Sequence, residues 1–177
     1  MVELISASRF RYTVDSLSSS VIFDAVFLLL AANGAPVLLG ALAGSYAMKP
    51  IDGGLRLSDG HPLFGTAKTW RGLFAACAAT PAAAYLLGQG PLTGLLFAVG
   101  TLCGDLLASF CKRRLGMAEG SHVRGLDTVP ESLFPLLMVK SSLGIGWLEI
   151  VISVGAFYLI EEWLSPVLVK WRLRKHP

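Results

Sequence analysis

Asp105 lies in an otherwise apolar segment, and three polar residues follow it at helical spacing. Ser109, Lys112 and Arg113 come four, seven and eight positions later, which places all four side chains on one helical face. The carboxylate would lie about 10 Å below Lys112 along the helix axis. An acid at depth with cations at the rim suits Mg²⁺ carrying a polyphosphate. Alternatively, the basic residues only anchor the helix end at anionic headgroups, and Asp105 is paired inside the protein.

A second acidic pair, Asp127 and Glu131, precedes the next apolar segment. The two residues are four apart, so they could complete an acidic cluster with Asp105 across two neighbouring helices. Acids and prolines such as Pro130 also favour the start of a helix, so N-terminal capping explains the same residues without chemistry. The sequence leaves both interpretations open.

A glycine-containing basic run precedes another apolar segment. Lys68, Thr69 and Arg71 follow Gly65, and at the N-terminus of a helix they could bind phosphate through backbone N–H groups and cations. The run lacks the glycine pattern of a nucleotide-binding P-loop. The alternative is a basic anchor at the membrane surface, with Trp70 among the interfacial aromatic residues.

Two polar residues nearer the N-terminus are also candidates. Asn33 lies with Pro36 inside an apolar segment, where an amide can form an interhelical hydrogen bond or serve a site. Asp52 lies in the run Pro50-Ile-Asp52-Gly-Gly, in the same basic loop as Lys68.

The composition indicates that membrane helices carry these residues. Of the 177 residues, 54% are hydrophobic and only 15% are charged, and the mean hydropathy is +0.62. Soluble domains average about 25% charged residues, so an ordinary soluble domain and a disordered chain are both excluded. The net charge of +3 gives no reason to expect a nucleic-acid partner. The three cysteines and three histidines are scattered, which indicates neither a disulfide framework nor a zinc site.

Five apolar stretches predict an all-α bundle of about five membrane-spanning helices, forming a single integral membrane domain over residues 1–177. The turn at Gly88–Gly90 predicts a helical hairpin. Glu161 and Glu162 interrupt the last stretch, so its end is expected along the membrane surface. An alternative makes the first stretch a signal peptide, although it is longer than a signal core needs. The five stretches are 21–47, 72–87, 91–110, 133–145 and 147–169.

Most Lys and Arg residues fall in three segments: after the first stretch, after the third and after the fifth. The short connections at 88–90 and 143–146 contain none. The positive-inside rule then places the three basic segments in the cytoplasm and the N-terminus outside. The two long basic loops would cap an active site on the cytoplasmic side, because loops of that length are usually functional.

Taken in order, these motifs resemble those of CDP-diacylglycerol synthases, which are integral membrane cytidylyltransferases. The family signature is similar to the run Gly104-Asp105-Leu-Leu-x-Ser109-x-x-Lys112-Arg113-x-Leu-Gly116, followed by Leu126-Asp127. A closer likeness, to the small CDP-archaeol synthases, rests on the short chain and on Asn33-x-x-Pro36, Pro50-Ile-Asp52 and Gly65-x-x-Lys68-Thr69-Trp-Arg71-Gly72. The resemblance covers residues 31–72 and 100–135, under half of the chain.

The resemblance implies that CMP is transferred from CTP to a phosphorylated glycerolipid, with release of pyrophosphate and with Mg²⁺ as cofactor. It implies that Asp105 and Asp127 bind the metal. Relatives often carry a second acid three residues after Asp127, where this chain has Pro130, so Glu131 would substitute as a ligand. The residues implied to hold nucleotide or phosphate are Asn33, Asp52, Lys68, Thr69, Arg71, Ser109, Lys112 and Arg113.

We therefore expect a lipid-phosphate cytidylyltransferase of the cell membrane, with CTP, a lipid phosphate and the bilayer as its partners. One alternative is the same chemistry on another lipid phosphate, such as a polyprenyl phosphate. A second is a small ion or solute transporter with Asp105 on its path. A third is a structural subunit without chemistry. No residue distinguishes ether isoprenoid tails from ester acyl tails, and none indicates an oligomeric state.

Overall fold

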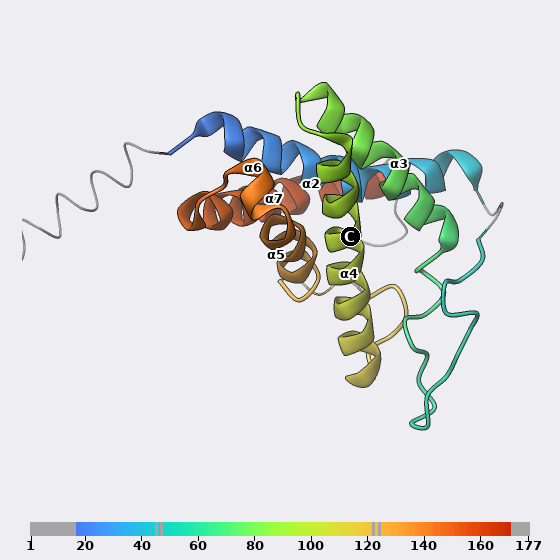
Figure 1. Ribbon diagram of the computed structural model, residues 1–177. Coiled ribbons are helices and arrows are strands. Elements are labelled where there is room, and N and C mark those ends of the chain that lie inside the picture. The colour runs from blue at the N-terminus through green and yellow to red at the C-terminus, as the bar shows by residue number, and fades with distance from the viewer. Residues whose placement is uncertain (1–16, 45, 47, 122, 124, 171–177) are drawn as a thin grey trace, which may run out of the picture.

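All the regular structure in the described residues is helical, as the sequence predicts (Figure 1). The computed structural model describes residues 17–44, 46, 48–121, 123 and 125–170, with only the backbone for 165–170. The terminal basic residues used to predict the orientation lie outside this range except for the backbone of Lys170, and Arg124 also lies outside it. The helices are α2 (Ser19–Ala43), α3 (Trp70–Leu86), α4 (Pro91–Arg114), α5 (Thr128–Met138), α6 (Lys140–Leu143) and α7 (Trp147–Lys170).

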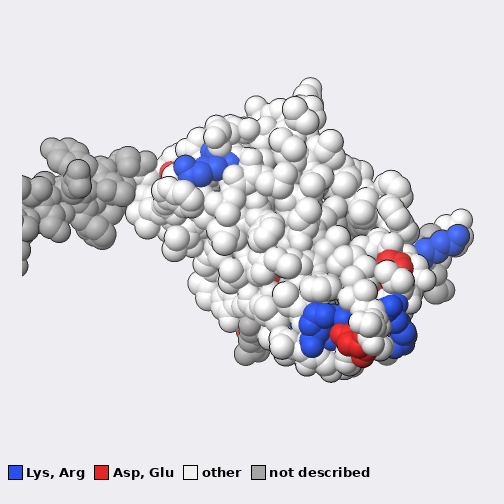
Figure 2. Space-filling model, turned by 60° about the horizontal axis from the view of Figure 1, so that its bottom comes forward, with Lys and Arg blue, Asp and Glu red and all other residues white. Residues whose placement is uncertain are grey.

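Two of these helices, α2 and α4, are long and apolar enough to cross a membrane, by a test that covers the described residues only. Large apolar side chains are also widely exposed on the surface: Phe23 is 61% exposed, Leu42 87% and Trp163 82%. Figure 2 shows one face on which charged residues gather mainly toward one edge, beside a broad uncharged surface. An exposed apolar area of this breadth marks a surface that contacts something other than water.

The predicted hairpin is confirmed. Helix α3 ends at Leu86, the turn passes through Gly88 at φ 74°, and α4 begins at Pro91. Proline suits this first position because its missing N–H has no helical partner there in any case. The two helices then pack closely, since a Cβ on Gly94 would lie 2.6 Å from the Cα of Pro81.

The fourth and fifth stretches differ from their predicted limits. Helix α5 begins at Thr128 rather than near Leu133, because polar residues form its first turn inside the protein. Helix α7 runs unbroken through Glu161 and Glu162 to Lys170, so the two acids interrupt the apolar sequence but not the helix, and the placement of its end along a membrane surface stays a prediction. Both residues are partly buried.

Helices α4 and α5 approach each other almost backbone to backbone. A Cβ on Gly100 would lie 2.6 Å from the Cα of Pro135, and one on Gly104 would lie 2.2 Å from the carbonyl oxygen of Pro130. Two glycines four apart on one helix face permit this approach, as in other closely packed membrane helices. The contact fixes Asp105, the next residue on α4, against the start of α5.

A small apolar core joins the helices around this contact. Leu28 and Leu29 of α2, Phe97 of α4 and Leu136 of α5 are fully buried in it, and Phe157 of α7 is 2% exposed. Helix α2 packs against α3 and α7, and less extensively against α4.

The two long loops lie at the same end of the molecule, beside the C-terminal end of α4 (Figure 1). The first loop is closed at its base by a bridge between Pro50 and Thr69. Its backbone bonds are 2.9 Å from the Ile51 nitrogen to the Lys68 oxygen and 3.1 Å from the Trp70 nitrogen to the Lys49 oxygen. This pairing sets where Lys68 stands.

Replacement of Gly104 tests the close contact of α4 with α5. We expect Gly104→Ala to lower the apparent Tm in detergent by about 5 °C, because overpacking costs about 1–3 kcal/mol. The matched control is Gly155→Ala on α7, where a Cβ would meet nothing within 4 Å. Equal thermal unfolding of the two variants would contradict the contact.

Candidate active site

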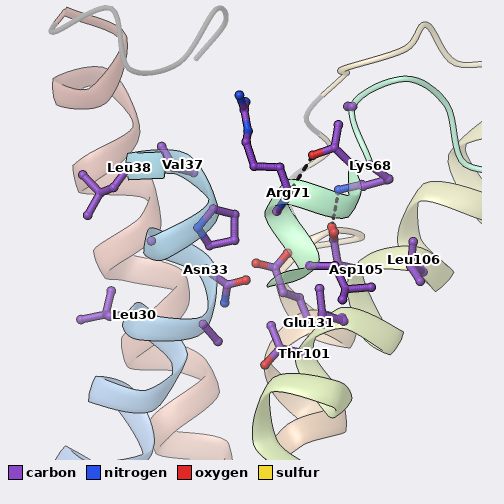
Figure 3. Close-up of a pocket in the computed structure, with 18 of the residues that line it drawn as sticks. Leu30, Asn33, Val37, Leu38, Lys68, Arg71, Thr101, Asp105, Leu106 and Glu131 are labelled. Atoms are coloured by element: carbon purple, nitrogen blue, oxygen red, sulfur yellow. Dashed lines mark hydrogen bonds and ion pairs between the residues drawn. The ribbon is translucent and has the colours of Figure 1, made fainter. Parts of the chain in front are cut away.

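A cavity of about 580 Å³ opens between α2, α4 and α7 and the start of α3. Most of its wall is apolar, with Leu30, Val37, Leu102 and Phe157 among the lining side chains. The polar residues that line it are Asn33, Lys68, Thr69, Arg71, Thr101, Asp105, Glu131 and Glu161. Residues from five helices and one loop therefore meet around one space, as the sequence predicts for several of them (Figure 3).

The ammonium of Lys68 is bound to the carboxylate of Asp105, with 2.5 Å between Nζ and Oδ1. The side chains are 24% and 27% exposed, so the pair remains open to the cavity. Burial lowers the pKa of Lys68, because it disfavours the charged ammonium. The negative charge of Asp105 and its hydrogen bond, with smaller contributions from Glu131 and Asp127, raise the pKa by more, so the net shift is upward. Lys68 therefore carries a positive charge at the cavity in the neutral pH range.

Glu131 lies on the first turn of α5 and is 9% exposed. Among the described residues, none donates a hydrogen bond to its carboxylate or forms an ion pair with it. Lys68, Asp105, Asp127 and Glu161 all lie within electrostatic reach of it. A buried carboxylate with this many acidic neighbours is costly unless a cation joins them.

Asp127 makes a separate pair with Lys112, with 2.6 Å between Nζ and Oδ1. The side chains are 9% and 11% exposed, and neither residue lines the cavity. Lys112 also donates to the carbonyl of Ser121 at 2.8 Å, and Asp127 accepts from the backbone N–H of Val123 at 2.9 Å. Asp127 stands at the N-cap position of α5 but makes no side-chain capping bond, so the capping interpretation does not hold for it.

The polar face of α4 is therefore only partly a cavity wall. Asp105 lines the cavity, but Ser109 and Arg113, although buried, do not. Arg113 donates to the carbonyl of Ala118 at 2.9 Å. The expectation that all four residues face one space is wrong, because the loop after α4 folds back over the helix end.

Thr69 and Arg71 stand at the start of α3, where a helix N-terminus is predicted. Thr69 is the N-cap, and its hydroxyl accepts from the N–H of Gly72 at 3.2 Å. Arg71 donates to the carbonyls of Gly44 and Tyr46 at 2.8 and 2.7 Å. Figure 3 shows its guanidinium directed away from Asp105.

Asn33 and Asp52 occupy different surroundings. Asn33 lines the cavity from α2, one turn before Pro36, and its Nδ2 donates to the carbonyl of Leu29 at 3.0 Å. Asp52 does not line the cavity and instead organises the first loop. Its carboxylate accepts from the N–H groups of Phe64 and Gly65 at 2.9 and 3.1 Å, and from that of Gly54 at 2.9 Å.

Two residues that sequence reasoning passed over join the loops to each other. Glu119 accepts from the N–H and the hydroxyl of Thr66 at 2.9 and 2.6 Å. These bonds hold the pKa of Glu119 below its usual range. Arg114 forms an ion pair with Asp59 and donates to the carbonyl of Pro62 at 2.5 Å. Both contacts are tertiary, so no spacing in the sequence indicates them.

Two carboxylates at the cavity could hold a divalent metal ion together with ligands from a substrate. Among the described residues, no three Asp, Glu, His or Cys side chains form a preformed metal site. Mg²⁺ usually takes one or two carboxylates together with substrate phosphates, so it needs no such cage. Asp105 and Glu131 supply two carboxylates at one cavity, and the Glu131 carboxylate lacks a hydrogen-bond donor among the described side chains.

Comparison with known proteins gives the family. The sequence model described as "CarS-like: CDP-archaeol synthase" matches residues 82–164. A CDP-archaeol synthase of Aeropyrum pernix is 36% identical over 135 residues, which cover 71% of this chain and 74% of the relative. The chain belongs to the CDP-archaeol synthase family. Within that family, a synthase of Methanococcus aeolicus is 33% identical over 160 residues, covering 79% of this chain and 84% of the relative.

Other members of the family match over a shorter stretch. A CDP-archaeol synthase of Hyperthermus butylicus is 40% identical over 109 residues, covering 58% of this chain. The matched part spans about three-fifths, 62%, of the length of that relative.

A solved structure carries the same fold. It is described as an intramembrane enzyme for archaeal membrane lipids biosynthesis. It superposes with a TM-score of 0.66 at 30% sequence identity, covering 80% of this chain and 92% of its own.

Replacement of Asp52 tests whether it organises the first loop. Burial opposes its charge, but the N–H donors of Phe64, Gly54 and Gly65 outweigh it, so the pKa of Asp52 is lowered. The stabilisation is therefore complete above the usual Asp pKa of about 3.9 and is lost as pH falls through the lower folded-state pKa. We expect Asp52→Asn to speed amide exchange of Phe64 and Gly65 roughly tenfold at neutral pH.

The control for this measurement is Asp24→Asn on α2, whose carboxylate accepts from Gln89 in the described structure. Exchange at Phe64 and Gly65 should be unchanged in that variant. Unchanged exchange in Asp52→Asn as well would show that the loop holds without its carboxylate.

Proposed function

We propose that this chain transfers CMP from CTP to the phosphate of a membrane glycerolipid and releases pyrophosphate, as a CDP-archaeol synthase. The observation that carries the proposal is the cavity itself. Lys68, Asp105 and Glu131 meet in it, between walls that are otherwise largely apolar. A cytidylyltransferase of lipids needs charged groups for phosphates directly beside apolar surface for hydrocarbon.

In the proposed reaction an oxygen of the lipid phosphate attacks the α-phosphorus of CTP. A new P–O bond forms, the bond to the β-phosphate breaks, and pyrophosphate leaves with the electron pair. Mg²⁺, when bound, neutralises charge on the triphosphate and on the leaving group. Asp105 and Glu131 would hold it, with Asp127 adding negative charge nearby.

The basic residues of the chain have two roles in this proposal. Lys68 lies in the cavity and balances charge on the reacting phosphates, where a desolvated ammonium acts most strongly. Lys112 and Arg113 support the end of α4 and the loop over it, through the carbonyls of Ser121 and Ala118. They reach phosphate only if substrate binding releases those contacts.

We propose that the chain is a single integral membrane domain of five spans in the cell membrane, with the N-terminus outside. The two long basic loops then lie on the cytoplasmic side, where CTP is available. This placement is supported by the broad exposed apolar surface and by the gathering of both loops at one end of α4.

Two acidic substitutions test the chemistry. We expect Asp105→Asn and Asp127→Asn each to reduce Mg²⁺-dependent formation of CDP-lipid by at least about 100-fold. Asp105→Asn removes charge beside the reacting phosphates, and Asp127→Asn breaks the ion pair with Lys112 that holds the end of α4 next to the start of α5. Membrane insertion should be retained. Labelled CTP and a panel of lipid phosphates, including a polyprenyl phosphate, measure both the activity and the substrate class.

The matched control is again Asp24→Asn, an acid-to-amide change on α2 outside the cavity. Near-normal activity of Asp105→Asn at saturating Mg²⁺ would refute the metal assignment. Flux of ions in sealed vesicles without nucleotide would favour a transporter instead.

Cysteine labelling tests the orientation. In a chain freed of Cys77, Cys103 and Cys111, we expect Ser142→Cys to react with a membrane-impermeant maleimide added outside intact cells. Ser58→Cys, in the first long loop, should react only after the membrane is opened. Both serines are exposed in the folded chain. The reverse labelling pattern would invert the proposed topology.

A further inference from the structure

Thr101 of α4 presents a buried hydroxyl that the fold does not use. The residue is 2% exposed, and its Oγ1 has no hydrogen-bond partner among the described residues. Ser153 of α7 is also buried without a hydrogen-bond partner among the described residues, but it does not line the cavity. Two further buried hydroxyls bond to the preceding helical turn. Thr80 donates to the carbonyl of Ala76 at 2.9 Å, and Ser132 donates to that of Thr128 at 2.6 Å. A buried hydroxyl left unpaired is costly, and Thr101 is the unpaired helical hydroxyl that lines the cavity, where a bound molecule can supply a partner.

The position of Thr101 narrows what that partner can be. It lies one helical turn before Asp105, about 6 Å further from the charged end of α4. It lines the cavity, and Figure 3 shows it below Glu131 and Asp105, across from Asn33 of α2. Asn33 donates one of its two amide N–H groups to the carbonyl of Leu29, and it makes no hydrogen bond with the Thr101 hydroxyl. The hydroxyl of Thr101 is therefore an uncommitted donor on the deeper part of the cavity wall.

We infer that the Thr101 hydroxyl donates a hydrogen bond to an oxygen of the glycerol backbone of the lipid substrate. The inference rests on the proposed function, which places the lipid phosphate beside Lys68 and Asp105. In a phosphorylated glycerolipid, the next oxygen atoms toward the tails are those that attach the chains to glycerol. Ether oxygens and ester oxygens both accept hydrogen bonds and cannot donate, so a hydroxyl donor suits either.

This assignment makes Thr101 a specificity-determining residue. A polyprenyl or simple alkyl phosphate has hydrocarbon at the depth of Thr101, so binding it leaves the buried hydroxyl unpaired, whereas a glycerolipid supplies an acceptor. Sites with a buried polar group reject analogues that lack its partner. The apolar neighbours Leu30, Leu102 and Phe157 then accommodate hydrocarbon from either class of lipid.

The test compares two variants on two classes of lipid phosphate. Thr101→Val removes the hydroxyl at almost constant shape, and Thr101→Ser keeps a donor. A phosphorylated dialkylglycerol is compared with a long-chain alkyl phosphate that has no glycerol, each as substrate or, if it does not react, as a competitive inhibitor. With the glycerolipid we expect Thr101→Val to lower kcat/KM about tenfold and Thr101→Ser to stay within about threefold of the native protein.

Three readouts separate recognition from a structural role. The KM for CTP should stay within about twofold in Thr101→Val, the constant for the alkyl phosphate should not weaken, and the apparent Tm should not fall. Thr80→Val serves as the control, since that hydroxyl is bonded within α3 and does not line the cavity.

Two results would overturn the inference: an unchanged kcat/KM for the glycerolipid in Thr101→Val, or equal losses with both lipid classes. Failure of the proposed function looks different, because the native protein itself would then convert no lipid phosphate with CTP.

Discussion

The close approach of α4 and α5 at Gly100 and Gly104 is the constraint on which the site depends. A Cβ at either glycine would run into the backbone of α5, at 2.6 Å from Pro135 and at 2.2 Å from Pro130. In a bilayer, apolar side chains gain little by leaving lipid for protein, so helices are held by close packing and by interior polar contacts. Here the packing places Asp105 of α4 beside Glu131 of α5. The two carboxylates lie close together because Gly100 and Gly104 have no side chain to hold α4 and α5 apart.

The polar interior contains two acid–base pairs that differ in their access to the cavity. Lys68 and Asp105 are each about a quarter exposed and line it, whereas Lys112 and Asp127 are about one-tenth exposed and lie behind it. In the open pair, an anion entering the cavity could replace Asp105 as the partner of Lys68, and a cation could replace Lys68 as the partner of Asp105. The sealed pair ties the end of α4 to the segment that leads into α5, through the additional bonds to Ser121 and Val123. One pair is thus accessible from the cavity, and the other is enclosed and holds the end of α4 to the segment before α5.

The sequence predicts the parts of this structure that depend on local rules. The hairpin at Gly88–Gly90 and the helix start at Thr69 follow from turn and capping preferences, and Asp105 is identified by its cost in an apolar helix. The same cost argument applies to Glu161, which lines the cavity, but its place beside Glu162 near the chain end favours a surface position instead. Thr101 gives no signal at all, because a helical threonine normally bonds its own backbone. The ion pair of Lys112 with Asp127 and the hydrogen bonds from Thr66 to Glu119 arise from tertiary folding, which sequence periodicity does not encode.

The bridge between Pro50 and Thr69 closes the base of a long excursion of the chain. Residues on the two sides of that base remain neighbours regardless of the length of the loop between them. Lys68 lies at this base, where its carbonyl accepts a hydrogen bond from the N–H of Ile51, and not at the distant tip around Gly60. Insertions or deletions at the tip would therefore leave the ammonium where it is, opposite Asp105, and would disturb only the outer contacts to Arg114. The fold separates a part of the loop that has to be invariant in position from a part that is free to diverge.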